Sequence, residues 1–318
     1  MGVCALVTGP TTGPDYTWRF ARQPMGAAVA NPRLPYRFSD SGPALKPAAA
    51  GRVLVHLVVN VEHWVFDAAM PRTIITPPHG KETIPDVPNF SWADYGMRAG
   101  LPRLLRAITE RGLTASTSIN ASVIEAYPQA AEAMLNAGWE FIGHGVHQKT
   151  QNTAGDEAAL VQQSLDILQR FTGQPTRGWL SPGLRETHDT PDILKAQGVQ
   201  YLCDWVVDDV PQWMQTKHGP LLSVPYNLEV NDSIIYAIEK HDSEQMFERT
   251  VRTLRLFERE SERTPRVFAI GLHPHLIGVP HRFESFERML DTLMASDAVG
   301  FVQGRDIFDW YAAQVPAP

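Results

Sequence analysis

The sequence has few cysteines and no long hydrophobic run. Its 318 residues include only two cysteines, Cys4 and Cys203, with no CxxC pair, so a cysteine-based zinc site is excluded and no disulfide framework is expected. No stretch approaches the about 18 apolar residues of a membrane-spanning helix, and the first residues lack the basic segment of a signal peptide. We therefore expect a cytoplasmic protein in a reducing compartment, without a membrane partner.

Several functional motifs are also missing. No glycine-rich phosphate loop follows a strand, which argues against a nucleotide-dependent reaction, and no GxSxG elbow is present, which argues against a serine hydrolase. The net charge is −7, and no basic cluster with interleaved aromatics occurs. We therefore expect a small-molecule substrate and no nucleic-acid partner.

The chain divides into an arm and one domain. Residues 1–50 are rich in Pro, Gly, Ala and Ser and predict an extended N-terminal arm, and residues 65–90 form a Pro-rich loop suited to a pocket wall. From residue 91 onward, helical and strand patterns alternate in seven or eight β-then-α units. This alternation predicts an α/β fold with a parallel sheet, closed or nearly closed into a (β/α)7–8 barrel over residues 51–318.

Polar residues stand where the predicted strands end. An apolar run over residues 53–59 leads to Glu62-His63, and later strands end at His144, Asp204 and His273. The carboxyl ends of barrel strands meet at one face, so these side chains are expected to share a pocket, although each alone could be structural. A carboxylate base, imidazoles and a second carboxylate suit water activation and leaving-group protonation during hydrolysis.

Further residues lie in loops next to these strand ends. Trp179 and Trp205 could stack on a flat heterocycle or could pack in the core. Ser181 and Pro182 could place a backbone amide against the substrate or only turn the chain, and Asp209 is expected to contact substrate or a second subunit.

The ordered motifs resemble the polysaccharide deacetylase (NodB-homology) superfamily over about residues 50–313, and most of all the branch with the metal-independent bacterial allantoinase and cyclic imide hydrolases. Two late loops are the most branch-specific signal. The matching segments are Val-Asn-Val-Glu62-His63, Gly143-His144-Gly145, Gly178–Gly183, Asp204–Pro211, Pro225–Asp232 and Leu272–Gly278.

The resemblance implies a distorted barrel, a homo-oligomer (tetramer or dimer) and roles for four residues. Glu62 matches the general base and His273 the general acid. His144 is implied to lie beside the scissile carbonyl, and Asp204 to orient or tune an imidazole.

The metal-binding pattern of the superfamily is altered here. Metal-dependent members hold zinc with Asp, His and His, the two His four residues apart. In this chain His63 stands at the Asp position and Gln148 follows His144 by four residues, with His147 one residue earlier. A zinc site of His63, His144 and His147 is chemically sensible, but the spacing favours catalysis without a metal, in which Glu62 activates water alone.

Three functions are consistent with these residues. The first is hydrolysis of a cyclic amide, imide or ureide, a carbon–nitrogen bond that is not a peptide bond. The second is removal of acetyl groups from N-acetylated sugars or peptidoglycan fragments, with a divalent metal. The third is a catalytically silent barrel that acts as a binding protein.

Overall fold

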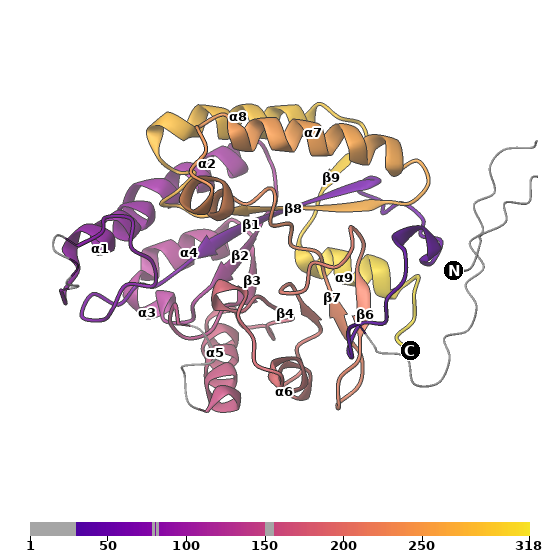
Figure 1. The fold of residues 1–318 in the computed structure, drawn as a ribbon, viewed down its shortest axis with the longest axis horizontal. Helices are drawn as coiled ribbons and strands as arrows, with labels where there is room; N and C mark the ends of the chain where they lie inside the picture. The colour runs from indigo at the N-terminus through magenta and orange to yellow at the C-terminus, as the bar shows by residue number, and fades with distance from the viewer. Residues whose placement is uncertain (1–29, 78–79, 81–82, 150–155) are drawn as a thin grey trace, which may run out of the picture.

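A curled sheet forms the centre of the fold (Figure 1). The computed structural model describes residues 30–77, 80, 83–149 and 156–318. The strands are β1 (Val53–Val61), β2 (Ser116–Ile119), β3 (Glu140–Gly143), β4 (Gly178–Trp179), β5 (Tyr201–Leu202), β6 (Gln212–Met214), β7 (Leu221–Ser223), β8 (Arg266–Leu272) and β9 (Val299–Phe301).

The strand order is β6-β7-β5-β4-β3-β2-β1-β8, and β9 pairs with β1. All pairings are parallel except the β6–β7 pair. β1 lies between β8 on one side and, on the other, β9 along its first half and β2 along its second half. The distorted (β/α) barrel is therefore confirmed, while the antiparallel strand β6 was not predicted.

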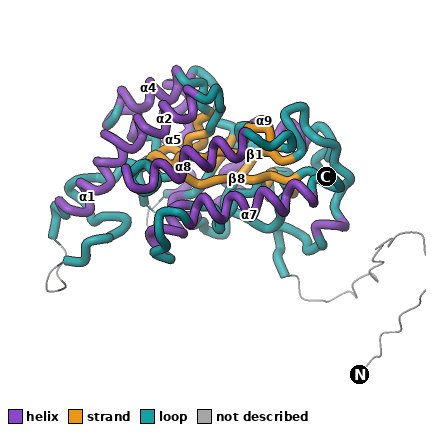
Figure 2. Tube along the Cα trace, turned by 90° about the horizontal axis from the view of Figure 1, so that it is seen from above, coloured by secondary structure: helices purple, strands orange, loops and turns teal. Residues whose placement is uncertain are grey.

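Helices cover the outside of the sheet, and α7 and α8 run together over β8 and β1 (Figures 1 and 2). The helices are α1 (Val87–Tyr95), α2 (Leu101–Glu110), α3 (Val123–Ala126), α4 (Pro128–Asn136), α5 (Glu157–Thr172), α6 (Thr190–Ala196), α7 (Gln245–Glu260), α8 (Pro280–Met294) and α9 (Gly304–Ala312). Single turns or short π-helices are η1 (Ser39–Ser41), η3 (Gly96–Gly100), η5 (Pro182–Leu184) and η6 (Ser233–Ile238).

Helix α5 begins and ends where its sequence predicts. The Asp156 carboxylate accepts a hydrogen bond from the amide of Ala159, which satisfies one of the free N–H groups of the first turn. Gly173 follows the last turn with φ of 74°, a left-handed conformation that favours glycine.

Side chains on β1 alternate between two cores. Val53, Val55, Leu57, Val59 and Val61 pack outward under the helices, in one large apolar cluster with residues of α2, α7 and α8. Leu54 and Val58 pack inside the barrel. This period of two decides which residues beyond the strand can reach the barrel interior.

A polar network fills the barrel interior at the amino ends of the strands. The buried carboxylate of Glu140 accepts hydrogen bonds from the Tyr201 hydroxyl, the Ser116 hydroxyl and the amide of Arg305 near the start of α9. His56 contacts the same Ser116 hydroxyl through Nε2, and burial lowers the pKa of His56 to about 3. This end of the barrel is therefore closed by a neutral imidazole and a carboxyl group with three donors.

The described part of the expected arm lies against the barrel. Arg33 forms an ion pair with Asp192 of α6, and the Lys46 carbonyl accepts from Trp310 of α9. Residues 1–29 of the arm and Cys4 lie outside the described residues. Within the described ranges, no helix is long and apolar enough to cross a membrane.

Candidate active site

Glu62 lies on the inner side of the barrel because it continues the alternation of β1. Leu54 and Val58 face inward. Because every second residue of a strand faces the same side, Asn60 and Glu62 also face inward. His63 consequently falls on the outer side. The two residues that are adjacent in the sequence therefore point to different surroundings.

The same alternation brings two histidines to Glu62. In β8, Phe268, Ile270 and Leu272 pack outward, and Val267 and Ala269 pack inward, so His273 faces inward. In β3, Phe141 packs outward and Ile142 inward, so His144 faces inward. Glu62, His144 and His273 all line one hollow, and the structure therefore brings these three predicted residues together.

Neutral donors hold the Glu62 carboxylate in place. The indole of Trp64 donates to Oε2 at 2.8 Å, and the side-chain amide of Gln148 donates to Oε1 at 2.9 Å. The same Oε1 lies 3.7 Å from His273 Nε2, and both side chains are 11% exposed. Each carboxylate oxygen keeps a lone pair for a proton, so Glu62 can act as a base.

His273 is held by a buried carboxylate that was not predicted. Its Nδ1 lies 2.6 Å from Asp232 Oδ1, and its backbone amide donates to Asp232 Oδ2. Burial lowers the pKa of His273, but the charge and hydrogen bond of Asp232, helped by Glu62, outweigh burial and raise it. The imidazole therefore favours its charged form, with Nε2–H directed to Glu62. The signal for Asp232 was its place in the branch-specific segment 225–232.

His144 has the opposite character. Its Nδ1 lies at hydrogen-bond distance from the carbonyl oxygen of Leu180, which can only accept, so Nδ1 carries a proton. Burial lowers the pKa of His144, so the ring is neutral. Nε2 then has a lone pair, and it has no hydrogen-bond partner within the described chain. His144 thus keeps a buried acceptor at the wall of the inner hollow, and it cannot donate to an oxyanion in this form.

Tyr226 and Asn60 form the floor of the hollow. The Tyr226 hydroxyl accepts hydrogen bonds from the side-chain amides of Asn60 and Asn231, so its own proton is free to be donated. Gly271 in β8 makes this possible, because a Cβ there would come within 2.6 Å of the Tyr226 hydroxyl. Neither Asn60 nor Tyr226 was predicted as a site residue.

A cavity opens above these residues at the carboxyl end of the sheet. It has a volume of about 550 Å³, and a smaller hollow of about 160 Å³ continues inward from it. Glu62, His273, Gln148 and Arg72 line both. Pro182 lines the outer cavity and Ser181 the inner hollow, as expected for the segment that contains them.

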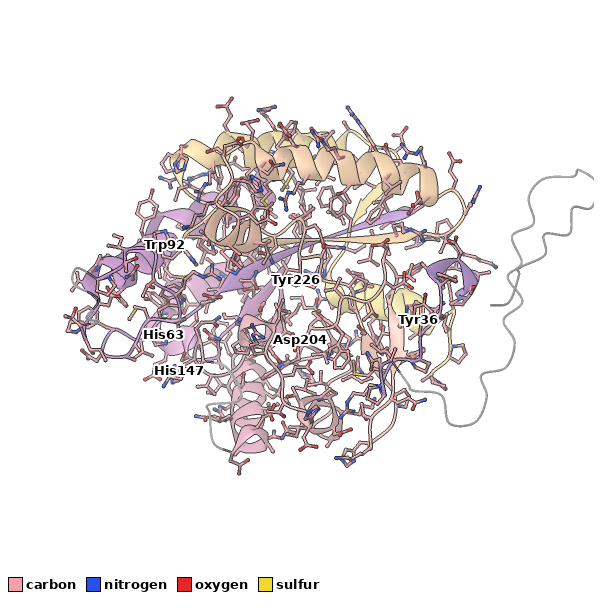
Figure 3. The ribbon with its side chains drawn as sticks, in the orientation of Figure 1. Tyr36, His63, Trp92, His147, Asp204 and Tyr226 are labelled. Carbon is pink, nitrogen blue, oxygen red and sulfur yellow. The ribbon has the colours of Figure 1, made fainter. Side chains whose placement is uncertain are left out.

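The three histidines of the alternative zinc site do not come together among the described residues. His63 turns outward, where its Nδ1 contacts the Ser122 hydroxyl and its ring meets His147 at 5.5 Å between centroids; Figure 3 shows the two rings close together, away from Tyr226. His144 is directed to the inner hollow instead. Among the described residues no group of three His, Cys, Asp or Glu side chains could hold a metal ion, so the set of His63, His144 and His147 is wrong as a metal site.

Asp204 supports the site from behind rather than lining it. Its Oδ1 accepts a hydrogen bond from the amide of Ser181 at 2.7 Å, next to the Leu180 carbonyl that holds His144. Burial, followed by the charge of Asp204, raises the pKa of the neighbouring Glu186 to about 10, and burial also raises that of Asp204. Asp204 therefore positions the chain at Ser181 and does not contact an imidazole, which corrects its predicted role.

Three other predicted substrate contacts lie elsewhere. Trp179 is completely buried among Leu194 and neighbouring residues of the α5–α6 side, so it cannot stack on a ligand. The Trp205 indole donates to Glu186, and Trp205 lines neither hollow. The carbonyl of Asp209 accepts from Val267 at the amino end of β8, the end opposite the cavity. None of the three can contact a substrate in this cavity, and a subunit contact at Asp209 stays a prediction.

Comparisons with known proteins place this geometry in a family. The family model described as "Polysaccharide deacetylase" matches residues 91–202. A Schizosaccharomyces pombe protein described as "Putative polysaccharide deacetylase" is 25% identical over 244 residues, which cover 70% of this chain and 76% of that protein.

Two solved structures are similar over nearly the whole domain. The crystal structure of a probable polysaccharide deacetylase from Pseudomonas aeruginosa PAO1 is 26% identical, with a TM-score of 0.74, and covers 85% of this chain and 94% of its own. The crystal structure of PuuE allantoinase is 23% identical, with a TM-score of 0.78, and covers 88% of this chain and 96% of its own. Residues 91–202 thus form a polysaccharide deacetylase domain by the family model, and over most of its length the chain is similar to proteins described as polysaccharide deacetylases.

Proposed function

We propose that this protein hydrolyses a cyclic amide, imide or ureide, with Glu62 as general base and His273 as general acid. The observation that carries the proposal is the 3.7 Å separation between Glu62 Oε1 and His273 Nε2, with Asp232 holding His273 in its charged form. At the level of the superfamily, the expectation of a hydrolase of non-peptide carbon–nitrogen bonds is confirmed, because the similar proteins are deacetylases and an allantoinase.

The mechanism follows from the protonation states. Glu62 removes a proton from a water molecule, and the water oxygen attacks the scissile carbonyl carbon. The Tyr226 hydroxyl, which has a free proton, is the donor available to the developing oxyanion. His273 then passes its Nε2 proton to the leaving nitrogen as the carbon–nitrogen bond breaks. His144 accepts a substrate N–H through Nε2 and so orients the amide.

A ring substrate is favoured by the shape of the site. The inner hollow of about 160 Å³ is small, and its lining combines Leu180, Leu184 and Ile234 with the polar groups already described. A small ring with an N–H and a carbonyl on adjacent atoms presents both to His144 and Tyr226.

Removal of an acetyl group from an N-acetylated sugar is the second candidate. The description of the matching family model supports it, and the same base and acid could cut an acetamide. The outer cavity of about 550 Å³ has room for one sugar ring. The described histidines do not assemble the zinc site that this candidate was expected to use.

The test is a hydrolysis panel with metal analysis of the purified protein. The panel contains allantoin, hydantoin, dihydrouracil, succinimide, glutarimide and chitin oligomers. The matched variants are Glu62→Gln and, as control, Glu110→Gln at the exposed end of α2. We expect turnover of at least one ring compound, lost in Glu62→Gln and kept in Glu110→Gln. Turnover of chitin oligomers alone would favour the second candidate, and unchanged turnover in Glu62→Gln would overturn the role of Glu62.

A further inference from the structure

Two cations at the active-site cavity have no acidic partner among the residues that the structure describes. Arg72 lines both hollows, and Lys149 lines the outer one. Within the described ranges, neither side chain takes part in an ion pair or a hydrogen bond. Elsewhere, arginines such as Arg111 and Arg249 are paired with carboxylates. Arg72 differs from these paired arginines and from exposed unpaired ones such as Arg106 because it lines the active-site cavity.

The charge of this cavity is opposite to that of the whole chain. The net charge of the protein is −7, yet Glu62 is the single carboxylate among the described residues that line the two hollows. Arg72, Lys149 and the charged His273 all face it. Asp232, which accepts from His273, lies behind that ring with no exposed surface. The cavity thus has an excess of positive charge.

Without a bound anion, the positive charge of Arg72 opposes the protonation of His273, the proposed catalytic acid. Burial and the charge of His273 lower the pKa of the neighbouring His275, and Arg72 lowers it further; Arg72 also opposes the raised pKa of His273. Arg72, His273 and His275 line the same cavity, so the guanidinium and the two imidazoles share one space. A bound anion would neutralise Arg72 and remove that opposition.

We infer that Arg72, assisted by Lys149, binds a carboxylate on the substrate, so that the natural substrate is an anionic ring amide. Arg72 is suited to this because a planar guanidinium can donate two parallel hydrogen bonds to one carboxylate. Lys149 lies at the exposed rim of the cavity, where its positive charge attracts the carboxylate without fixing its orientation. The inference rests on the proposed function, because it names the substrate class of the same site.

The kinetic test compares substrates that differ in one carboxylate. Hydantoin-5-acetate is paired with hydantoin, and dihydroorotate with dihydrouracil. We expect kcat/KM of the wild type to favour the acidic member at least about tenfold, the range of one charge-assisted hydrogen-bond pair. Arg72→Gln should reduce that ratio to near one, chiefly through KM. Arg106→Gln, an exposed arginine of α2, serves as control and should keep the ratio.

A binding test separates this inference from the proposed reaction. Titration calorimetry with succinamate and its neutral analogue succinamide needs no turnover. We expect the wild type to bind succinamate at least about tenfold more tightly, with the preference shrinking as NaCl rises from about 0.05 M to about 0.5 M. Arg72→Gln should lose the preference. Arg72→Lys, which keeps the positive charge but cannot donate two parallel hydrogen bonds, should retain part of it.

The outcomes are distinguishable. A preference for succinamate that disappears in Arg72→Gln supports the anion site even if no ring compound is hydrolysed, in which case only the proposed reaction fails. Equal binding of the two probes, a preference that persists in a folded Arg72→Gln protein, or an undiminished preference in a folded Arg72→Lys protein overturns the inference. Circular dichroism melts of each variant establish that the protein is folded.

Discussion

Each end of the barrel interior buries a histidine and a carboxyl group, but the two ends differ in the charge of the histidine and in the open volume beside it. At the amino end, His56 lies beside Ser116, and burial lowers its pKa to about 3. At the carboxyl end, His273 is also deeply buried, yet Asp232 and Glu62 overcome burial and raise its pKa. One imidazole is neutral and the other favours its charged form, although both are removed from water.

The difference shows that burial alone does not make a histidine functional. A carboxylate at hydrogen-bond distance and an adjoining hollow are both needed. Glu140 is held by three donors and does not line the hollow shared by His144 and His273, whereas Glu62 is held by two donors and lines that hollow. The amino end therefore contributes stability, and the carboxyl end contributes chemistry.

Replacing the histidine at each end should have the largest and most unequal effect. We expect His273→Asn to lower kcat/KM by about 10²- to 10⁴-fold, the range of general acid–base catalysis, because the leaving nitrogen loses its proton donor. His56→Asn should leave kcat/KM nearly unchanged and lower the melting temperature. Steady-state kinetics and thermal melts of both variants measure this. A similar loss of activity in a folded His56→Asn protein would contradict the comparison.

The pH dependence should reveal how Asp232 acts. In the proposed mechanism His273 acts in its charged form, which is present below its raised pKa, so kcat/KM should fall as pH rises through that pKa. In Asp232→Asn the main group that raises the pKa is removed and burial remains, so the fall should move to lower pH. Activity at neutral pH should drop by up to about 10-fold for each unit by which the pKa falls. The pH profile of kcat/KM checks this prediction; a fall that stays at the same pH in Asp232→Asn would refute the role of Asp232.

Removing one donor from the amino-end network should change stability only. Tyr201→Phe deletes the hydroxyl that donates to Glu140. The free energy of unfolding should fall by about 1–3 kcal/mol, because the buried carboxyl group loses a partner. Denaturant titration gives the stability, and kcat/KM should stay within about twofold, as for a surface change. Loss of activity without loss of stability would show that the two ends are coupled.

The smallest effect is expected at His63. Its side chain contacts Ser122 and His147 outside the barrel and lines neither hollow. We expect His63→Ala to change kcat/KM by less than about threefold, a change that corresponds to under 1 kcal/mol. Adding a chelator should act equally on this variant and the wild type. A loss comparable to that of His273→Asn would restore the metal-site hypothesis.

Much of the fold and part of the site could be predicted from local patterns. The apolar run 53–59 and the alternation of helices and strands predicted the barrel, and the strand ends located Glu62, His144 and His273. The period of two was already present in the sequence and would have placed His63 outside, had it been extended two residues past the strand. The alternative of a zinc site assumed that His63 and His147 point inward with His144, whereas His63 lies on the outer side next to Ser122 and His147 lies beside it.

Other site residues depend on contacts between distant segments. Asp232 and His273 are hydrogen-bonded although they are 41 residues apart in the sequence, and Tyr226 and Asn60 are hydrogen-bonded although they are 166 residues apart. Arg72 is ordinary in a Pro-rich loop until the loop folds over the cavity. Trp179 shows the reverse case, since an aromatic beside a motif was expected at the substrate and is packed in the core.

The buried polar network at the amino end of the barrel limits how substrate and product can enter and leave the site. With His56, Glu140 and the start of α9 filling that end, whatever enters the inner hollow must leave by the carboxyl-end mouth. Opening a ring produces a single molecule, which can retreat along the path it entered. Cutting an open-chain amide produces two, and the fragment formed deeper would be trapped until the outer one departs. A dead-end chamber thus suits a reaction that cleaves a bond without separating its pieces.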